Sequence, residues 1–245
     1  MLTNQFTLTR TRALSWLRKL EEATPSFTVY IAGPAAKQDV EKMLLMVLDR
    51  GLLLDELVDK ALKSPTGAAI YYTTGKAYVV WPPFPVKDNM ASRGYDPAQL
   101  KTMLEHDWRL GLVLVRLGHY AIMIAGGDKL VEAFAGTGLV HARHHKGGSS
   151  SQRFARHREK QMESFFTRVE GHAREIMEPH LKEIDFILYG GTRDTLQVMW
   201  KQCSFFTRLR GKVVDRLISV REPKRSSFEE AIELAYMSTI FEITE

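Results

Sequence analysis

The most unusual stretch of the sequence is a glycine- and serine-rich run followed directly by closely spaced arginines. It reads Lys146-Gly147-Gly148-Ser149-Ser150-Ser151-Gln152-Arg153-Phe154-Ala155-Arg156-His157-Arg158. Glycine and serine in such a run cannot pack a core and leave the backbone free to adopt many conformations. The amide of Gln152 does not titrate near neutral pH, so it can orient a water molecule but cannot act as an ordinary general base. We therefore expect an arm that reaches along phosphates and presents Gln152 in a narrow site.

Positive charge is concentrated around this stretch. The chain has 245 residues and a net charge of +5, yet outside residues 141–160 its bases and acids are equal in number. The bases within that window are Arg143, Lys146, Arg153, Arg156, Arg158 and Lys160. On a helix, Arg153, Arg156 and Lys160 line one side. Such focused charge predicts a polyanionic partner held through its phosphates, although a solvated basic loop and helix would have the same composition.

Histidines near the loop raise two other kinds of chemistry. His141, His144 and His145 have a spacing that could ligate a metal, or cleave an RNA phosphodiester by acid–base catalysis. No cysteine or carboxylate lies near them, so we expect no metal and assign them to the nucleic-acid face. The single cysteine, Cys203, lies among Trp200, Phe205 and Phe206, which predicts a buried thiol rather than a nucleophile.

Composition excludes several protein classes. One cysteine rules out an intrachain disulfide and indicates a reducing compartment. The first 18 residues lack the apolar core of a secretory signal, and no run is apolar enough to span a membrane. Neither GxGxxG nor a phosphate loop is present, and we expect no cofactor. The sequence predicts a soluble, cytoplasmic protein that does not associate with membranes.

The first part of the chain alternates helical and extended patterns. Apolar spacing predicts helices over residues 9–23, 36–49 and 52–63, a strand over 27–32, and a hairpin of strands 69–72 and 77–81. The proline-rich stretch that follows Trp81 and runs to Pro97 predicts a stiff linker. Residues 1–95 thus form an N-terminal α/β region, which either extends the core sheet or makes a small domain.

The second part, residues 96–245, predicts a mixed β-sheet with flanking helices. A helix over 98–106 precedes three strands at 110–116, 120–125 and 130–134, which are separated by tight glycine turns and indicate an antiparallel meander. A flexible loop is expected over 142–152 and a long helix over 153–177. A strand at 184–189, a helix at 192–203, a strand at 212–220 and a helix at 228–237 complete an α/β domain.

The loop and the helix after it resemble a known family. Gly147-Gly148, followed by Arg153-Phe154-Ala155-Arg156 and Arg158, is similar to the catalytic middle domain of eukaryotic and archaeal class-1 translation release factors. The likeness extends over about residues 108–240, through the strand ending at Gly190-Gly191, the strand beginning Lys212-Val213-Val214 and the helix containing Ala231-Ile232-Glu233-Leu234. The glutamine departs from the release-factor pattern, because Ser149 stands directly after the two glycines. Gly148-Ser149-Ser150-Ser151-Gln152 instead resembles the Gly-Ser-x-x-Gln loop of the Vms-like release factors.

This resemblance implies a codon-independent peptidyl-tRNA hydrolase that frees nascent chains from stalled large ribosomal subunits. Gln152 would orient the attacking water, Gly147, Gly148 and Ser149 would complete the catalytic loop, and the six bases listed above would hold rRNA and tRNA. We expect the protein to act as a monomer. Two alternatives remain at this stage: a non-catalytic factor that occupies the ribosome, and a nuclease acting on the tRNA 3′ end.

Overall fold

A computed structural model describes residues 2–49, 51–141 and 150–244. The chain divides into two compact units, which are treated separately below. The first comprises Met1–His106, Val214–Arg216 and Glu233–Glu245, and the second comprises Asp107–Val213 and Leu217–Ile232. Each unit is built on its own β-sheet, so the N-terminal region forms a separate sheet and does not extend the second one.

The first unit contains a six-stranded sheet with the order β1-β11-β4-β3-β2-β5. All of its neighbouring strands are antiparallel. The strands are β1 (Leu2–Leu8), β2 (Phe27–Ile31), β3 (Ala68–Thr73), β4 (Lys76–Trp81), β5 (Met90–Arg93) and β11 (Ser238–Thr244). The helices are α1 (Arg10–Glu22), α2 (Lys37–Leu44), α3 (Leu52–Leu62) and α4 (Ala98–Glu105).

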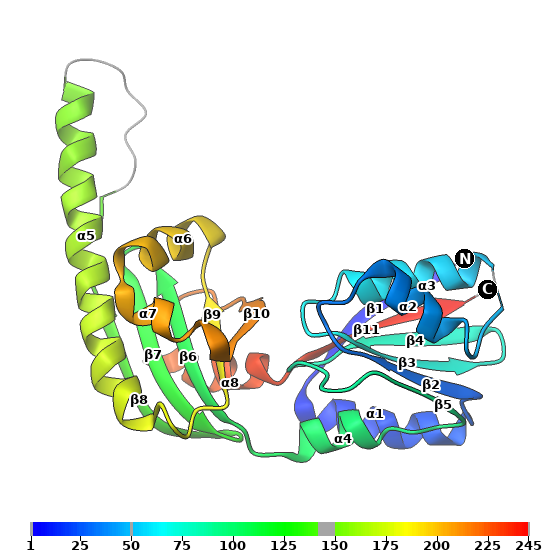
Figure 1. The fold of residues 1–245 in the computed structure, drawn as a ribbon. Coiled ribbons are helices and arrows are strands. Elements are labelled where there is room, and N and C mark those ends of the chain that lie inside the picture. Colours follow the sequence, from blue (N-terminus) through cyan, green and yellow to red (C-terminus); the bar gives the residue numbers. More distant parts are fainter. Residues whose placement is uncertain (1, 50, 142–149, 245) are drawn as a thin grey trace. The chain divides into compact units, whose positions relative to one another are not determined.

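The two faces of this sheet are covered by different helices (Figure 1). On β2, alternate residues Phe27, Val29 and Ile31 pack with residues of α2 and α3, because successive side chains of a strand point to opposite faces. Tyr30 points the other way, and its hydroxyl lies 2.9 Å from that of Tyr71 and 3.3 Å from the main-chain nitrogen of Leu100 in α4. The helices predicted from apolar spacing therefore cover both faces of the sheet.

The proline-rich stretch after β4 is part of this unit and is not a linker. Phe84 is 1% exposed and Val86 is 4% exposed, and the main-chain nitrogen of Val86 donates to the oxygen of Thr66, 2.9 Å away. β5 pairs with β2. The division between the units follows His106, not residue 95, because α4 packs with the first unit.

The second unit contains a five-stranded mixed sheet with the order β10-β9-β6-β7-β8. β6, β7 and β8 form the predicted antiparallel meander, while β9 and β10 run parallel to β6. The strands are β6 (Arg109–Arg116), β7 (His119–Gly126), β8 (Lys129–Thr137), β9 (Phe186–Gly190) and β10 (Val213–Ile218). The helices are α5 (Ser150–Met177), α6 (Arg193–Gln202), α7 (Ser204–Arg208) and α8 (Phe228–Ala235), with short 3₁₀ turns at Glu178–His180, Arg210–Lys212 and Arg225–Ser227. Val214–Arg216 of β10 and the last three residues of α8 are grouped with the first unit.

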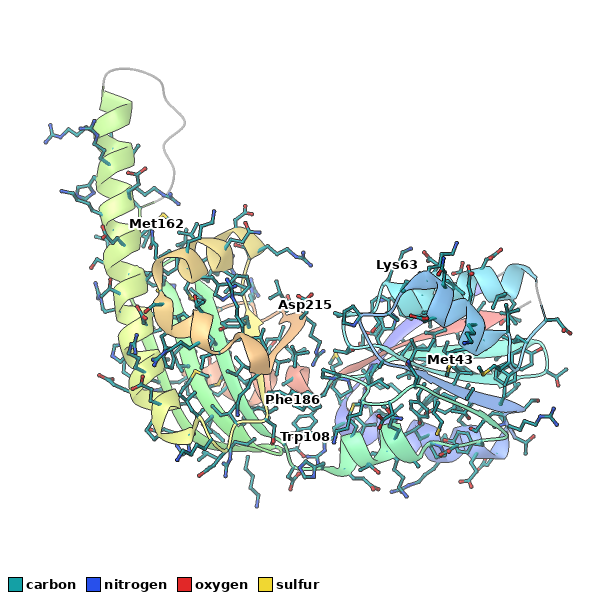
Figure 2. The ribbon with its side chains drawn as sticks, in the orientation of Figure 1. Met43, Lys63, Trp108, Met162, Phe186 and Asp215 are labelled. Atoms are coloured by element: carbon teal, nitrogen blue, oxygen red, sulfur yellow. The ribbon has the colours of Figure 1, made fainter. Side chains whose placement is uncertain are left out.

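One face of the mixed sheet carries the core beneath α5, α6 and α7. Phe165, Val169 and Ala173 of α5 are fully buried there with side chains from β6, β7 and β9, as the helical spacing predicts. Phe205 and Phe206 of α7 belong to the same buried core. At the amino ends of β6 and β9, the rings of Trp108 and Phe186 make a T-shaped contact with centroids 5.0 Å apart (Figure 2). This core fixes α5 against the sheet.

Candidate functional site

The N-terminal part of α5 extends beyond the sheet (Figure 1). We call residues 150–164 the basic arm, because Phe165 is the first buried residue among the side chains of the helix that the structure describes. Fifteen residues of α-helix span about 22 Å. The arm carries Arg153, Arg156, Arg158 and Lys160 against two acids, Glu159 and Glu163. Met162 lies near the base of the arm (Figure 2).

Three of these bases are free to meet a partner. Arg153, Arg156 and Lys160 are exposed, and within the described part of the chain no hydrogen bond or ion pair engages their side chains. Their spacing of three and four residues places them along one side of the helix. Phe154, between two of them, is 55% exposed. An exposed row of cations with an aromatic ring beside it can contact both the phosphates and the bases of RNA.

Arg158 has a different environment. Its side chain is half-buried, Nε donates to the main-chain oxygen of His141 at 3.1 Å, and Nη1 lies 3.1 Å from the sulfur of Met162. The main-chain nitrogen of His141 donates to Oε1 of Gln161, also at 3.1 Å. The ring of His157 lies 6.3 Å from that of His141, centroid to centroid. Side chains of the arm thus bind both main-chain polar groups of His141, the last described residue before Ser150.

This attachment of His141 was missed from the sequence, where only the charge of Arg158 was noted. The signal that could have found it is helical spacing, since Gln161 lies four residues after His157 and three after Arg158 and is therefore a neighbour of both on the helix surface. Nothing in the sequence indicates that the face meets His141, because that contact depends on where β8 ends.

The body of the helix is held by a second set of polar contacts. The hydroxyl of Tyr120 lies 2.8 Å from Nδ1 of His172, and the His172 ring stacks on Phe134 with centroids 3.8 Å apart. Nη1 of Arg168 lies 3.5 Å from the main-chain oxygen of Thr137, at the end of β8. These contacts come from β7 and β8 and fix the position from which the basic arm starts.

Gln152 lies in the first turn of α5, because the helix begins at Ser150 and not at Arg153 as predicted. Serine is well tolerated at helix starts, which accounts for the earlier beginning. The main-chain N–H groups of a first helical turn have no acceptor within the helix. The other predicted loop residues, Arg143, Lys146, Gly147, Gly148 and Ser149, lie outside the described residues, and so do His144 and His145.

Other candidates from the sequence lie in structural positions. Cys203 is 1% exposed, and burial, with Glu170 adding to it, raises the pKa of its thiol to about 12. A thiol with that pKa carries almost no thiolate near neutral pH and is not a nucleophile. Gly190, Gly191 and Thr192 form the predicted turn from β9 into α6. Among the described residues, no group of three or more histidine, cysteine, aspartate or glutamate side chains could hold a metal ion.

A family model for the Actinobacteria/chloroflexi VLRF1 release factor matches residues 108–240. The chain belongs to this family. The matched range covers the mixed sheet, the basic arm and α6 to α8, so the family assignment and the candidate site concern the same unit. The implied relationship to release factors and the mixed α/β fold are both confirmed.

The individual relatives that match this chain have low sequence identity to it. The chain is 24% identical over 159 residues to peptide chain release factor subunit 1 of Picrophilus torridus, and 29% identical over 161 residues to that of Archaeoglobus fulgidus. Each match covers 64% of this chain and 38% or 39% of the relative, so the chain spans about two fifths of these proteins' length.

Two solved structures have low similarity to this chain: the archaeal translation termination factor aRF1 and the Vms1 mitochondrial localization core. The first has a TM-score of 0.42 and 17% identity, covering 93% of this chain and 70% of the other. The second has a TM-score of 0.41 and 13% identity, covering 89% of this chain and 92% of the other.

Among the described residues of this chain, every helix is too short or too polar to cross a membrane.

Proposed function

We propose that this VLRF1 protein is a codon-independent peptidyl-tRNA hydrolase that releases nascent chains from stalled large ribosomal subunits in the cytoplasm. The observation that carries the proposal is the position of Gln152, in the first turn of a basic helix that extends beyond the sheet. Support comes from the Gly148-Ser149-Ser150-Ser151-Gln152 motif and from membership of a release-factor family. The protein acts as a monomer.

The reaction is hydrolysis of the ester between the nascent peptide and the terminal ribose of tRNA. The oxygen of a water molecule attacks the ester carbonyl carbon, and the bond from that carbon to the ribose oxygen then breaks. One proton of the water ends on the ribose oxygen and the other passes to the solvent, which leaves a free peptide carboxylate and a tRNA with an intact 3′ hydroxyl.

Gln152 contributes orientation and hydrogen bonds, not proton abstraction. Its side-chain amide accepts from and donates to the attacking water, which holds the oxygen on the line to the carbonyl carbon. Free N–H groups of the first helical turn, including that of Gln152, donate to the oxygen that becomes negatively charged. Gly147 and Gly148 allow the backbone to approach the ester closely. The ribosomal RNA and the tRNA ribose supply the remaining groups.

The bases of the loop and the arm bind RNA. Arg153, Arg156 and Lys160 contact phosphates of rRNA and tRNA, and Arg143 and Lys146 continue this contact along the loop. Arg158 also contributes charge, because the guanidinium group has five N–H donors and His141 takes only one of them.

The test uses purified protein and isolated large subunits that carry peptidyl-tRNA. Wild-type protein is expected to release the peptide, and Gln152→Ala is expected to abolish release while leaving subunit binding unchanged. Gln202→Ala is the matched control, since Gln202 is exposed at the end of α6. Unchanged release by Gln152→Ala would overturn the assignment.

The same reaction also separates the two alternatives. The tRNA 3′ end is analysed after the reaction, and an intact CCA end supports ester hydrolysis. A shortened end would identify a nuclease. Wild-type protein that binds the subunit without releasing peptide would identify a non-catalytic occupancy factor.

A further inference from the structure

The mixed sheet holds a cavity at one of its edges. A cavity of about 320 Å³ opens at the carboxyl ends of the parallel strands β6, β9 and β10. Its walls come from Arg116 at the end of β6, from residues 190–192 after β9, and from residues 217–221 at the end of β10. Ligands of α/β sheets commonly bind outside this edge. We call this hollow the sheet-edge cavity.

One wall of the sheet-edge cavity is main chain. A Cβ at Gly190 would lie 2.6 Å from Leu114 and 2.9 Å from the main-chain oxygen of Ile218, so no side chain fits there. Gly191 has a φ of +135°, and a Cβ there would lie 2.1 Å from the main-chain oxygen of Val115. The strands approach so closely here that only glycine fits. The wall therefore presents backbone groups, next to Thr192, the N-cap of α6.

The rim of the sheet-edge cavity is positively charged. Arg116 and Arg221 both line the cavity and both are exposed, and Nη1 of Arg116 donates to the main-chain oxygen of Arg221. A hydrogen bond from Lys224 lowers the pKa of Glu222, and the charges of His119 and Arg116 lower it further. The two charged side chains that line the cavity, Arg116 and Arg221, are both cationic.

The sheet-edge cavity and the basic arm lie at the same end of the sheet. Arg116 pairs with His119 across β6 and β7, and His119 pairs with Thr137 at the end of β8. α5 passes this edge where Arg168 lies 3.5 Å from Thr137, and the arm extends beyond it (Figure 1). An RNA that follows the arm toward the sheet therefore reaches the edge that holds the cavity.

We propose that the sheet-edge cavity binds a phosphate group of an RNA backbone. Arg116 and Arg221 bind the phosphate oxygens from the rim, and the glycine wall lets the phosphate approach the main chain. With the basic arm, the cavity provides a second anchor on one unit, which raises the effective concentration of each contact once the other has formed. The choice of RNA over a free anion rests on the proposed function.

The test is amide NMR of the full chain, first with inorganic phosphate and then with an RNA hairpin that has a tRNA acceptor stem. We expect the amide signals of residues 190–192 to shift saturably with each probe, and the RNA to compete with phosphate. Arg221→Glu should weaken the binding that these signals report by about tenfold or more. Arg18→Glu, at an exposed position of α1, is the charge-matched control.

Each other outcome overturns a stated part of the proposal. Absence of saturable shifts, or shifts that Arg221→Glu leaves unchanged, would show that the cavity is not an anion site. Shifts with phosphate that RNA neither reproduces nor competes with would overturn the RNA assignment. Gln152-dependent release is measured separately, so the proposed function can stand when the cavity proposal fails, and the cavity can bind phosphate when release fails.

Discussion

Arg158 and His141 are joined by a hydrogen bond from a guanidinium Nε to a main-chain oxygen, 3.1 Å long. With Gln161, which accepts from the nitrogen of the same residue, it ties the end of the segment after β8 to α5. Residue 141 and the start of α5 at Ser150 are the two ends of the stretch that contains Gly147 and Gly148. His141, which we call the stem of the predicted loop, is therefore held in place by side chains of the arm.

Loss of the Gln161 contact should reduce release more than it reduces ribosome binding. Gln161→Leu leaves the N–H of His141 without its acceptor, at a cost of about 1 kcal/mol, or about fivefold in the population with the stem attached. We expect a fall in the single-turnover release rate of that order. The dissociation constant for the large subunit should stay unchanged, because Gln161 is half-buried against His141.

The conservative variant distinguishes this positioning role from a general loss of stability. A carboxylate at position 161 still accepts from the N–H of His141, so Gln161→Glu should retain most of the release rate that Gln161→Leu loses. Equal losses in the two variants would contradict the positioning role.

The exposed bases of the arm should control the salt dependence of binding. Within the described residues, the side chain of Arg156 makes no hydrogen bond or ion pair and faces solvent, so Arg156→Ala removes only its contact with a phosphate. The slope of log affinity against log salt should decrease in magnitude by about one. Binding to large subunits over a range of potassium chloride concentrations measures the slope. Arg18→Ala is the control, and an equal change in that variant would point to an effect of net charge alone.

The elements that the sequence predicted well have strong local signals. Gly118 and Gly127 have positive φ in the two turns of the meander, which explains why a glycine marks each turn. The apolar spacing of α5 correctly predicted which face of the helix is buried. β1 and β11 were missed because Leu2–Leu8 and Ser238–Thr244 pair with each other from opposite ends of the chain, and no local pattern reports such a contact.

The candidate site was predictable in its chemistry but not in its supports. Gln152 and the row Arg153, Arg156 and Lys160 follow from residue type and helical spacing. The link from Arg158 and Gln161 to His141 requires the end of β8 to lie beside α5, which depends on tertiary packing. The sheet-edge cavity likewise depends on residues from three strands that are distant in the sequence.

Two glycine substitutions should change stability in opposite directions. Gly191→Ala places a Cβ against the main-chain oxygen of Val115 and requires a φ of +135°, so we expect a loss of at least about 2 kcal/mol in the free energy of unfolding. Gly171→Ala, in the middle of α5, meets no atom within 4 Å and should gain about 0.5–1 kcal/mol from helix propensity. Urea unfolding measures both, and a stabilising Gly191→Ala would contradict the close approach of the strands at this turn.

Cys203 should make the free energy of unfolding depend on pH in the alkaline range. Burial raises the pKa of its thiol from 9.0 to about 12 in the folded state, so between these values the folded protein keeps a proton that the unfolded chain releases. The free energy of unfolding therefore falls as pH rises from 9 toward 12, by at most about 1.4 kcal/mol per pH unit from this group. Tyr30 titrates in the same range, with a pKa raised to about 12, so the measurement is the difference from Cys203→Ala. The variant should be less stable at neutral pH but should lose stability less steeply above pH 9. Parallel curves would show that the thiol does not titrate differently on unfolding, and rapid alkylation of the folded wild type at neutral pH would contradict its burial.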